Sequence, residues 1–120
     1  MDFLEVFKDS EDVMDFPAGS IIASEGAEGN HMYVVMTGEV TISINNRTMA
    51  TVVPGEIVGE MALINSNIRS ATVTAKTDCR LAFIDQASFN SLLRYVPDFS
   101  QHVMKVLADR LKHAYEVIGD

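Results

Sequence analysis

Two oppositely charged residues, Glu60 and Arg69, lie in an otherwise apolar stretch and are candidates for binding a small charged molecule. The stretch covers residues 54–75, PGEIVGEMALINSNIRSATVTA, and eight residues separate the acid from the base. Gly59 directly precedes the acid, and residues 61–63 are expected to form one short helical turn. A glycine beside a helix start lets the backbone approach a ligand closely. This spacing favours a pocket for a small molecule with hydroxyl groups and one negative charge.

The same two charges also have a purely structural interpretation. Glu60 and Arg69 could form a salt bridge with each other and tie a loop to the rest of the domain. Ion pairs between loop residues are common in proteins and contribute little to stability when exposed. The spacing of the two residues alone leaves both interpretations open.

Composition limits the classes of partner. The chain has 120 residues, of which 48% are apolar and 22% charged, as in an ordinary globular domain. Its formal net charge is −8, with 9 basic and 17 acidic residues. A surface for DNA, RNA or an anionic membrane needs clustered Lys and Arg, so we expect neither nucleic acid nor membrane as a partner. An anionic ligand must be held by local groups, because the overall field repels it.

Further features suggest a cytoplasmic protein. Cys79 is the single cysteine, which excludes an intrachain disulfide, and its strand-like surroundings favour a buried, inert thiol. The N-terminal residues 1–12 are acidic and lack the basic and apolar regions of a signal peptide. No apolar run approaches the length of a membrane span.

Most of the chain before residue 85 is expected to form short strands joined by glycine-rich turns. Val40, Ile42 and Ile44 alternate and are expected on the buried face, and Asn45-Asn46 is expected to form a two-residue hairpin turn. The expected strands cover residues 13–16, 20–24, 31–36, 39–44, 47–53, 70–75 and 79–84. With no helix of crossover length between them, roughly eight strands should form an antiparallel sandwich or jelly roll.

Beyond residue 84 the apolar period changes from that of strands to that of helices. Asp85 can cap a helix over residues 86–94, and Pro97 suits the first turn of a longer helix. One apolar stripe follows this longer helix. Its members are Phe99, Val103, Leu107, Leu111, Ala114 and Ile118. The stripe can pack on its own domain, cover a ligand, or meet a second copy or a partner protein.

Residues 59–72, GEMALINSNIRSAT, resemble the phosphate-binding cassette of cyclic nucleotide-binding domains. That family includes bacterial catabolite activator proteins, regulatory subunits of cyclic-AMP-dependent kinase and nucleotide-gated channels. The similarity extends to the glycine pattern of the early strands, in residues 16–26 and 32–40, and to the Pro-Gly pair at residues 54–55. It therefore covers about the whole chain.

The resemblance implies one mainly β domain over residues 1–120, an antiparallel jelly roll with flanking helices. Its expected parts are an N-terminal helix at 1–12, the jelly roll at 13–84 with the cassette at 58–72, and C-terminal helices at 85–118. The resemblance also implies the role of each polar residue. Arg69 would bind the cyclic phosphate, Ser70 would add a hydroxyl or backbone contact, and Glu60 would accept the ribose 2′-hydroxyl. The ligand-binding set is Val58, Gly59, Glu60, Met61, Ala62, Arg69, Ser70 and Ala71.

The purine contacts are expected from the C-terminal helix. Leu111 and Tyr115 lie near the position where that helix would reach the pocket, and Ala114 cannot supply the hydroxyl that activator-type relatives place there. Tyr115 has an alternative role as an aromatic side chain that packs on a strand. The Arg69-Ser70 pair favours cyclic AMP over cyclic GMP, because activator-type relatives with Arg-Ser bind cyclic AMP.

The expected function is that of a non-catalytic sensor that needs no cofactor or metal. Phosphate capture would act through Leu63 and Ile64 and shift the C-terminal helices, in proportion to the ligand's differential affinity for the two helix positions. One alternative is a ligand-free interaction or dimerisation module of the same fold, which would contact a second copy or a partner protein through the C-terminal helix. Another is a metal-dependent cupin-like enzyme, but His31 lacks the usual His-x-His partner and the other histidines lie on the long helix. The chain ends at Asp120 without an output domain, so we expect a stand-alone sensor or a fragment of a longer protein.

Overall fold

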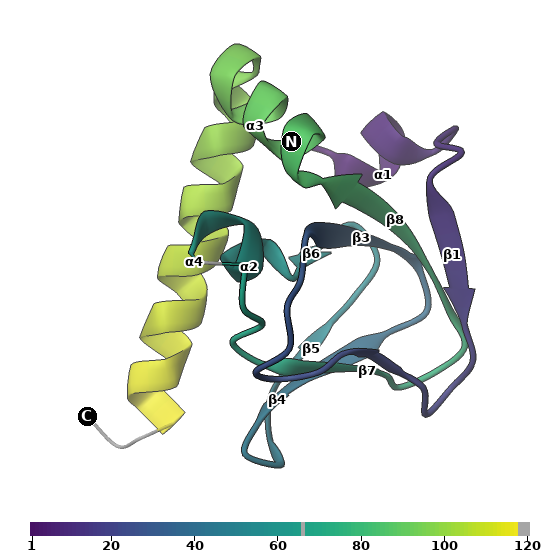
Figure 1. The fold of residues 1–120 in the computed structure, drawn as a ribbon, viewed down its shortest axis with the longest axis vertical. Helices are drawn as coiled ribbons and strands as arrows, with labels where there is room; N and C mark the ends of the chain where they lie inside the picture. The colour runs from purple at the N-terminus through teal and green to yellow at the C-terminus, as the bar shows by residue number, and fades with distance from the viewer. Residues whose placement is uncertain (66, 118–120) are drawn as a thin grey trace. The chain divides into compact units, whose positions relative to one another are not determined.

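The computed structural model describes residues 1–65 and 67–117. They divide into a β unit, residues 2–86, and a helical unit, residues 87–117, and each unit is described by itself. The β unit contains eight strands and two short helices, and the helical unit contains most of α3 and all of α4 (Figure 1).

The β unit is built from two antiparallel four-stranded sheets. The first has the strand order β1-β8-β3-β6, with β1 Val13–Phe16, β8 Cys79–Asp85, β3 His31–Thr37 and β6 Ile57–Val58. The second has the order β2-β7-β4-β5, with β2 Ile21–Ala23, β7 Thr72–Ala75, β4 Val40–Ile44 and β5 Arg47–Val52. All strand pairs are antiparallel, which confirms the predicted sheet type.

One core joins the two sheets of the β unit. Val35, Leu81 and Val58 come from the first sheet, and Val40 and Val73 from the second, and all five are buried in the same cluster. Burial of such side chains is the main term that stabilises the fold, at roughly 25 cal/mol per Å² of apolar surface. Figure 1 shows the sheets curving around this shared interior.

The β4–β5 hairpin is partly as expected. Asn45 and Asn46 form its turn with φ of 51° and 63°, the left-handed conformation that asparagine tolerates, so this prediction is confirmed. The prediction that Ile44 is buried is wrong, because it is 38% exposed. The register shifts between Ile42 and Ser43, and a bulge of this kind re-aims the side chains that follow it.

The strand β6 and the start of β7 differ from expectation. β6, which pairs Ile57 with Val34, was missed because two residues after a Pro-Gly turn are too short to show alternation. β7 begins at Thr72 and not at residue 70. The backbone of Arg69 is instead paired with the loop before β3, through Arg69 N–H to Ala27 O at 2.8 Å.

The N-terminal helix is shorter than the expected residues 1–12, whereas the helices expected at residues 61–63 and 86–94 each extend slightly further. α1 covers Phe3–Phe7 and begins at the N-cap Asp2, whose carboxylate accepts a hydrogen bond from Glu5 N. α2 covers Glu60–Ile64, α3 Gln86–Tyr95 and α4 Pro97–Val117. Residue 118, the expected end of the last helix, lies outside the described residues. α4 begins at Pro97, so the proline is at the first helical position, as predicted.

Within the helical unit, the turn between α3 and α4 is held by local contacts. The rings of Phe89 and Phe99 meet edge to face, with centroids 5.8 Å apart. Ser100 Oγ donates to Leu93 O at 3.1 Å, and Phe99 N–H donates to Val96 O at 3.0 Å. These contacts fix the angle between the two helices.

Candidate functional site

The left-handed backbone of Gly59 starts the candidate site. β6 ends at Val58, and Gly59 follows with φ +85° as the N-cap of α2. L-residues with a side chain rarely adopt this conformation. A Cβ on Gly59 would also lie 2.8 Å from Arg69 Nη1 and 3.5 Å from Tyr33 Cδ2. The glycine therefore permits both the turn into α2 and the close approach of the arginine.

Arg69 is a buried cation. Its side chain is 6% exposed, Nη1 donates to Gly59 O at 3.0 Å, and Cζ lies 5.6 Å from the centroid of the Tyr33 ring. Within the described residues no carboxylate lies in ion-pair range of its guanidinium. Arg69 thus does not form the salt bridge with Glu60 that the structural alternative required. A buried charge without a counter-charge is unfavourable unless something else neutralises it.

A loop before β3 holds Arg69 from the other side. Arg69 N–H donates to Ala27 O, and Gly26 N–H donates to Arg69 O, both at 2.8 Å. Glu28 and Ile68 add a single antiparallel bridge. The side chain of Arg69 crosses Gly29 so closely that a Cβ there would overlap Nε and Cζ. The sequence separation of about forty residues between loop and arginine hid this contact from sequence reasoning.

Glu60 is the second buried charged residue of the site. It is 1% exposed and is the first residue of α2. Its Oε2 atom accepts no hydrogen bond within the described part of the chain, although the residue has other interactions with its surroundings. Glu60 follows Gly59 directly in the chain, and the described residues show no ion pair between Glu60 and Arg69.

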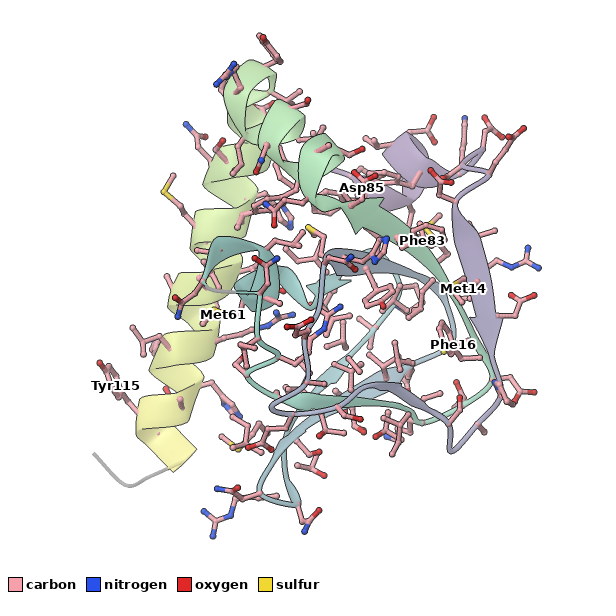
Figure 2. The ribbon with its side chains drawn as sticks, viewed as in Figure 1. Met14, Phe16, Met61, Phe83, Asp85 and Tyr115 are labelled. Atoms are coloured by element: carbon pink, nitrogen blue, oxygen red, sulfur yellow. The ribbon has the colours of Figure 1, made fainter. Side chains whose placement is uncertain are left out.

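The other predicted binding residues surround these two. The exposed ones are Met61, on α2 (Figure 2), and Ser70, next to the arginine. The remaining three are Val58, which is 1% exposed, Ala62, which is 1% exposed, and Ala71, which is half-buried. The first turn of α2 leaves its backbone N–H groups without intrahelical acceptors, as at any helix start.

The two expected base contacts belong to the helical unit. Leu111 and Tyr115 lie four residues apart on α4, and each is about half exposed. Figure 2 labels Tyr115 on this helix. This spacing puts them on one face of the helix. Their contact with a base stays a prediction.

Sequence reasoning missed two residues that contact Arg69. Gly29 gives no signal beyond a glycine-rich loop, and its role depends on contact with a residue forty positions later. Tyr33 is one of several β-formers in β3, and only the pairing of Tyr33 with Val58 brings its ring to the arginine. The one signal that could have identified Tyr33 is that it is an aromatic residue on β3, the strand that pairs with the residue before the Gly59 turn.

Other features of the described residues do not add chemistry. No group of three or more His, Cys, Asp or Glu side chains among them is arranged to hold a metal ion. Burial raises the pKa of the Cys79 thiol, with smaller contributions from Asp78 and Asp15, so the thiol stays protonated. A groove of about 470 Å³ passes Phe16 and Arg80, and Figure 2 shows Phe16 far from Met61. No helix in the described part has the length and apolar character to cross a membrane.

Comparison with known proteins gives a consistent result. Residues 13–95, more than half of the chain, match the family model of the cyclic nucleotide-binding domain. The cAMP-dependent protein kinase regulatory subunit of Schizosaccharomyces pombe is 40% identical over 79 residues, which are 65% of this chain and 19% of that protein. This chain spans between 19% and 50% of the length of the curated relatives it matches.

Solved structures agree in fold. The Thermus thermophilus catabolite activator protein is 30% identical with a TM-score of 0.77, and the match covers 88% of this chain and 52% of that one. The EAL enzyme Bd1971 in its cAMP-bound form is 34% identical with a TM-score of 0.66, over 88% of this chain and 30% of that one. Its cGMP-bound form is also 34% identical, with the same TM-score, over 82% of this chain and 27% of that one.

Proposed function

This chain belongs to the cyclic nucleotide-binding domain family, and we propose that it binds a cyclic nucleotide through residues 58–71 and acts as a regulatory module without catalytic activity. One observation carries the proposal. Arg69 is 6% exposed and has no carboxylate partner among the described residues. A cyclic phosphate carries a single negative charge that could serve as the ion-pair partner of Arg69.

The electrostatics favour local capture of an anion. The chain has a net charge of −8, so its overall field repels a phosphate. The guanidinium uses Nη1 for Gly59 O and keeps further N–H groups that could donate to phosphate oxygens. Charge-assisted hydrogen bonds of this kind contribute ~1.5–3 kcal/mol each when they are shielded from water. Ser70 and the N–H groups of Met61 and Ala62 would add neutral donors.

Glu60 is proposed to select ribose. An ionised carboxylate only accepts hydrogen bonds, so it suits the 2′-hydroxyl of a ribose and not a phosphate. Gly59 precedes Glu60, and its carbonyl accepts the hydrogen bond from Arg69. Because Gly59 has no side chain, it leaves open the space in which a Cβ would contact the guanidinium. Val58 and Ala71 would form the apolar wall beside the sugar.

The nucleotide is proposed to be cyclic AMP in preference to cyclic GMP. The named function of the Schizosaccharomyces pombe relative supports cyclic AMP, whereas Bd1971 is known in forms bound to either nucleotide. We further propose that Leu111 and Tyr115 contact the base, and that α3 and α4 move when it binds. The moved face of α4 would then contact a second copy of the chain or a partner protein. In this proposal the base is contacted from α4, so these steps depend on that helix.

Calorimetric titration of the protein with cyclic AMP and with cyclic GMP tests the proposal. We expect saturable, one-to-one binding of both, with the lower Kd for cyclic AMP. An absence of heat with either nucleotide at high micromolar concentration would refute nucleotide binding and leave the alternative of a ligand-free interaction module. Equal affinities would refute only the preference.

The role of Glu60 can be tested separately with 2′-deoxy cyclic AMP. Loss of the 2′-hydroxyl should weaken binding to the parent protein by about tenfold, because one hydrogen bond to a charged acceptor is lost. For Glu60→Gln the penalty for the deoxy analogue should fall to about threefold or less. Glu11→Gln, an exposed glutamate outside the site, is the control. An equal penalty in all three proteins would show that Glu60 does not contact the ribose.

A further inference from the structure

Two side-chain amides connect three segments of the β unit, which are the loop before β3, the cassette and α2. Asn67 Nδ2 lies 3.4 Å from Gly29 O and 3.3 Å from Gln86 Oε1. Gln86 Nε2 lies 3.2 Å from Leu63 O. The chain of contacts therefore runs from the loop that packs on Arg69, through the cassette, to the last turn of α2.

The orientation of both amides is fixed by their neighbours. Gly29 O and Leu63 O are carbonyl oxygens, so each must receive a hydrogen from an amide nitrogen. Gln86 then presents its oxygen to Asn67 and its nitrogen to Leu63. If the Gln86 amide were turned over, two oxygens would face each other at one end and two nitrogens at the other. The arrangement is thus one continuous donor–acceptor chain.

The backbone of Asn67 is also held in an uncommon conformation. Its φ is +58°, which asparagine tolerates better than most residues. Its carbonyl accepts from Gly29 N–H at 2.8 Å, so Gly29 meets both the backbone and the side chain of Asn67. Arg69 lies two residues further on. A constraint on the backbone of Asn67 therefore restricts the position of the Arg69 backbone.

We propose that Asn67 and Gln86 are positioning residues that hold Arg69 ready for the ligand, an inference that rests on the proposed nucleotide binding. Neither touches the phosphate in this role. They act by fixing the cassette between Gly29 and Leu63, and Arg69 follows because it is two residues from Asn67. Gln86 is also the first residue of α3, so the same amide connects the cassette to the start of that helix. A rigid cassette binds more tightly because less ordering is required on binding.

The test replaces the amides and leaves the backbone intact. Gln86→Met keeps the length of the side chain but removes both hydrogen bonds. Asn67→Gly removes the other amide, and glycine accepts the left-handed backbone at this position. Gln101→Met, at an exposed glutamine on α4, is the matched control. Because Asn67→Gly changes no buried volume, it keeps the test valid if Gln86→Met unfolds the protein.

Two readouts are used, one without ligand and one with cyclic AMP. In the ligand-free protein, the backbone N–H hydrogens of Gly29 and Arg69 should exchange with solvent about tenfold faster in both variants than in the parent. The backbone N–H hydrogens of β3 and β8 should keep their protection. The Kd for cyclic AMP should rise about three- to tenfold. Gln101→Met should change neither readout.

The outcomes separate the two proposals. If the parent protein does not bind the nucleotide, the proposed function fails, and the ligand-free exchange still measures whether the amides hold the cassette. If the parent binds and both variants match it in exchange and affinity, the positioning role is overturned. It is also overturned if exchange rises equally across β3 and β8, because the amides would then stabilise the whole unit and not the cassette.

Discussion

Two arginines of the β unit, Arg69 and Arg80, have opposite surroundings. Arg80 lies on β8 and is exposed, and it holds Asp15 through two hydrogen bonds, Nε to Oδ1 at 2.7 Å and Nη2 to Oδ2 at 3.1 Å. Arg69 is 6% exposed, donates to the carbonyl of Gly59 and has no carboxylate partner within the described residues. The exposed cation is neutralised by the protein, and the buried one is not.

This difference separates a charge that the protein itself neutralises from the charge that we propose binds the ligand. An exposed ion pair contributes little to stability, because water and salt screen it. A buried cation is costly to hold, so a fold that retains one without a counter-charge has a reason outside its own stability. Here the close packing of Arg69 against Gly29 and Tyr33 keeps the guanidinium in place. The comparison predicts that ligand affinity depends on Arg69 and on the residues packed against it, Gly29 and Tyr33, and not on Arg80.

The largest effect should come from removing the two arginines in turn. Arg69→Ala should raise the Kd for cyclic AMP by about 10- to 100-fold, because charge-assisted hydrogen bonds worth ~1.5–3 kcal/mol are lost. Arg80→Ala should leave the Kd unchanged. Calorimetric titration of both variants measures the contrast. If Arg69→Ala bound as tightly as the parent, Arg69 would be a structural residue, and the proposed functional difference between Arg69 and Arg80 would be wrong.

A smaller effect should follow from filling the space that Arg69 occupies. Gly29→Ala puts a methyl group where Nε and Cζ of Arg69 lie, so the arginine must move. We expect about a tenfold rise in the Kd and a loss of ~1–3 kcal/mol in the free energy of unfolding, as for other overpacked sites.

Gly19→Ala is the matched control for this substitution. Gly19 has φ +88° and open space around its Cβ position, so alanine there introduces backbone strain without a clash. It should lower stability by about 1 kcal/mol and leave the Kd unchanged. If both variants lost affinity in proportion to stability, the loss would reflect general destabilisation and not displacement of Arg69.

The Tyr33 ring should have a weaker influence. A cation 5.6 Å from the ring centroid gains ~0.5–2 kcal/mol, depending on exposure. Tyr33→Leu removes the aromatic face and should raise the Kd about threefold. Tyr33→Phe keeps the face and should bind like the parent. An equal loss in both variants would instead implicate the hydroxyl group.

Much of the fold could be predicted from the sequence because its signals are local. The alternation in β4, the asparagine turn after it and the proline that starts α4 each depend on a few neighbouring residues. Gly59 and Glu60 were predicted as part of the site for the same reason, since a glycine before a helix start has a local signature.

The rest depends on contacts between distant segments. Ile44 alternates with Val40 and Ile42, but the bulge after Ile42 cannot be seen in the sequence. The burial of Arg69 depends on Gly29 and Tyr33, about forty residues earlier, so composition gives no sign that one arginine is buried and another exposed. The resemblance to a family predicted Arg69 as a binding residue, but the physical reason for its burial required the structure.

The smallest effect concerns the ion pair of the exposed arginine. Hydrogen bonding to Arg80 lowers the pKa of the Asp15 carboxyl and outweighs the opposing effect of desolvation, and the charge of Arg80 adds a smaller lowering contribution. A lowered pKa in the folded state means that the pair stabilises the fold above the pKa of the unfolded chain, about 3.9, and that this stabilisation is lost as the pH falls through the folded pKa. The melting temperature of Asp15→Asn should therefore lie slightly below that of the parent at neutral pH, and the two should converge in acid below about pH 4.

Asp9→Asn, an exposed aspartate on the same unit, should follow the parent at every pH. A constant difference between Asp15→Asn and the parent down to the lowest pH would show that Asp15 acts through packing and not through its charge, and Arg80 would then no longer be the neutralised counterpart of Arg69.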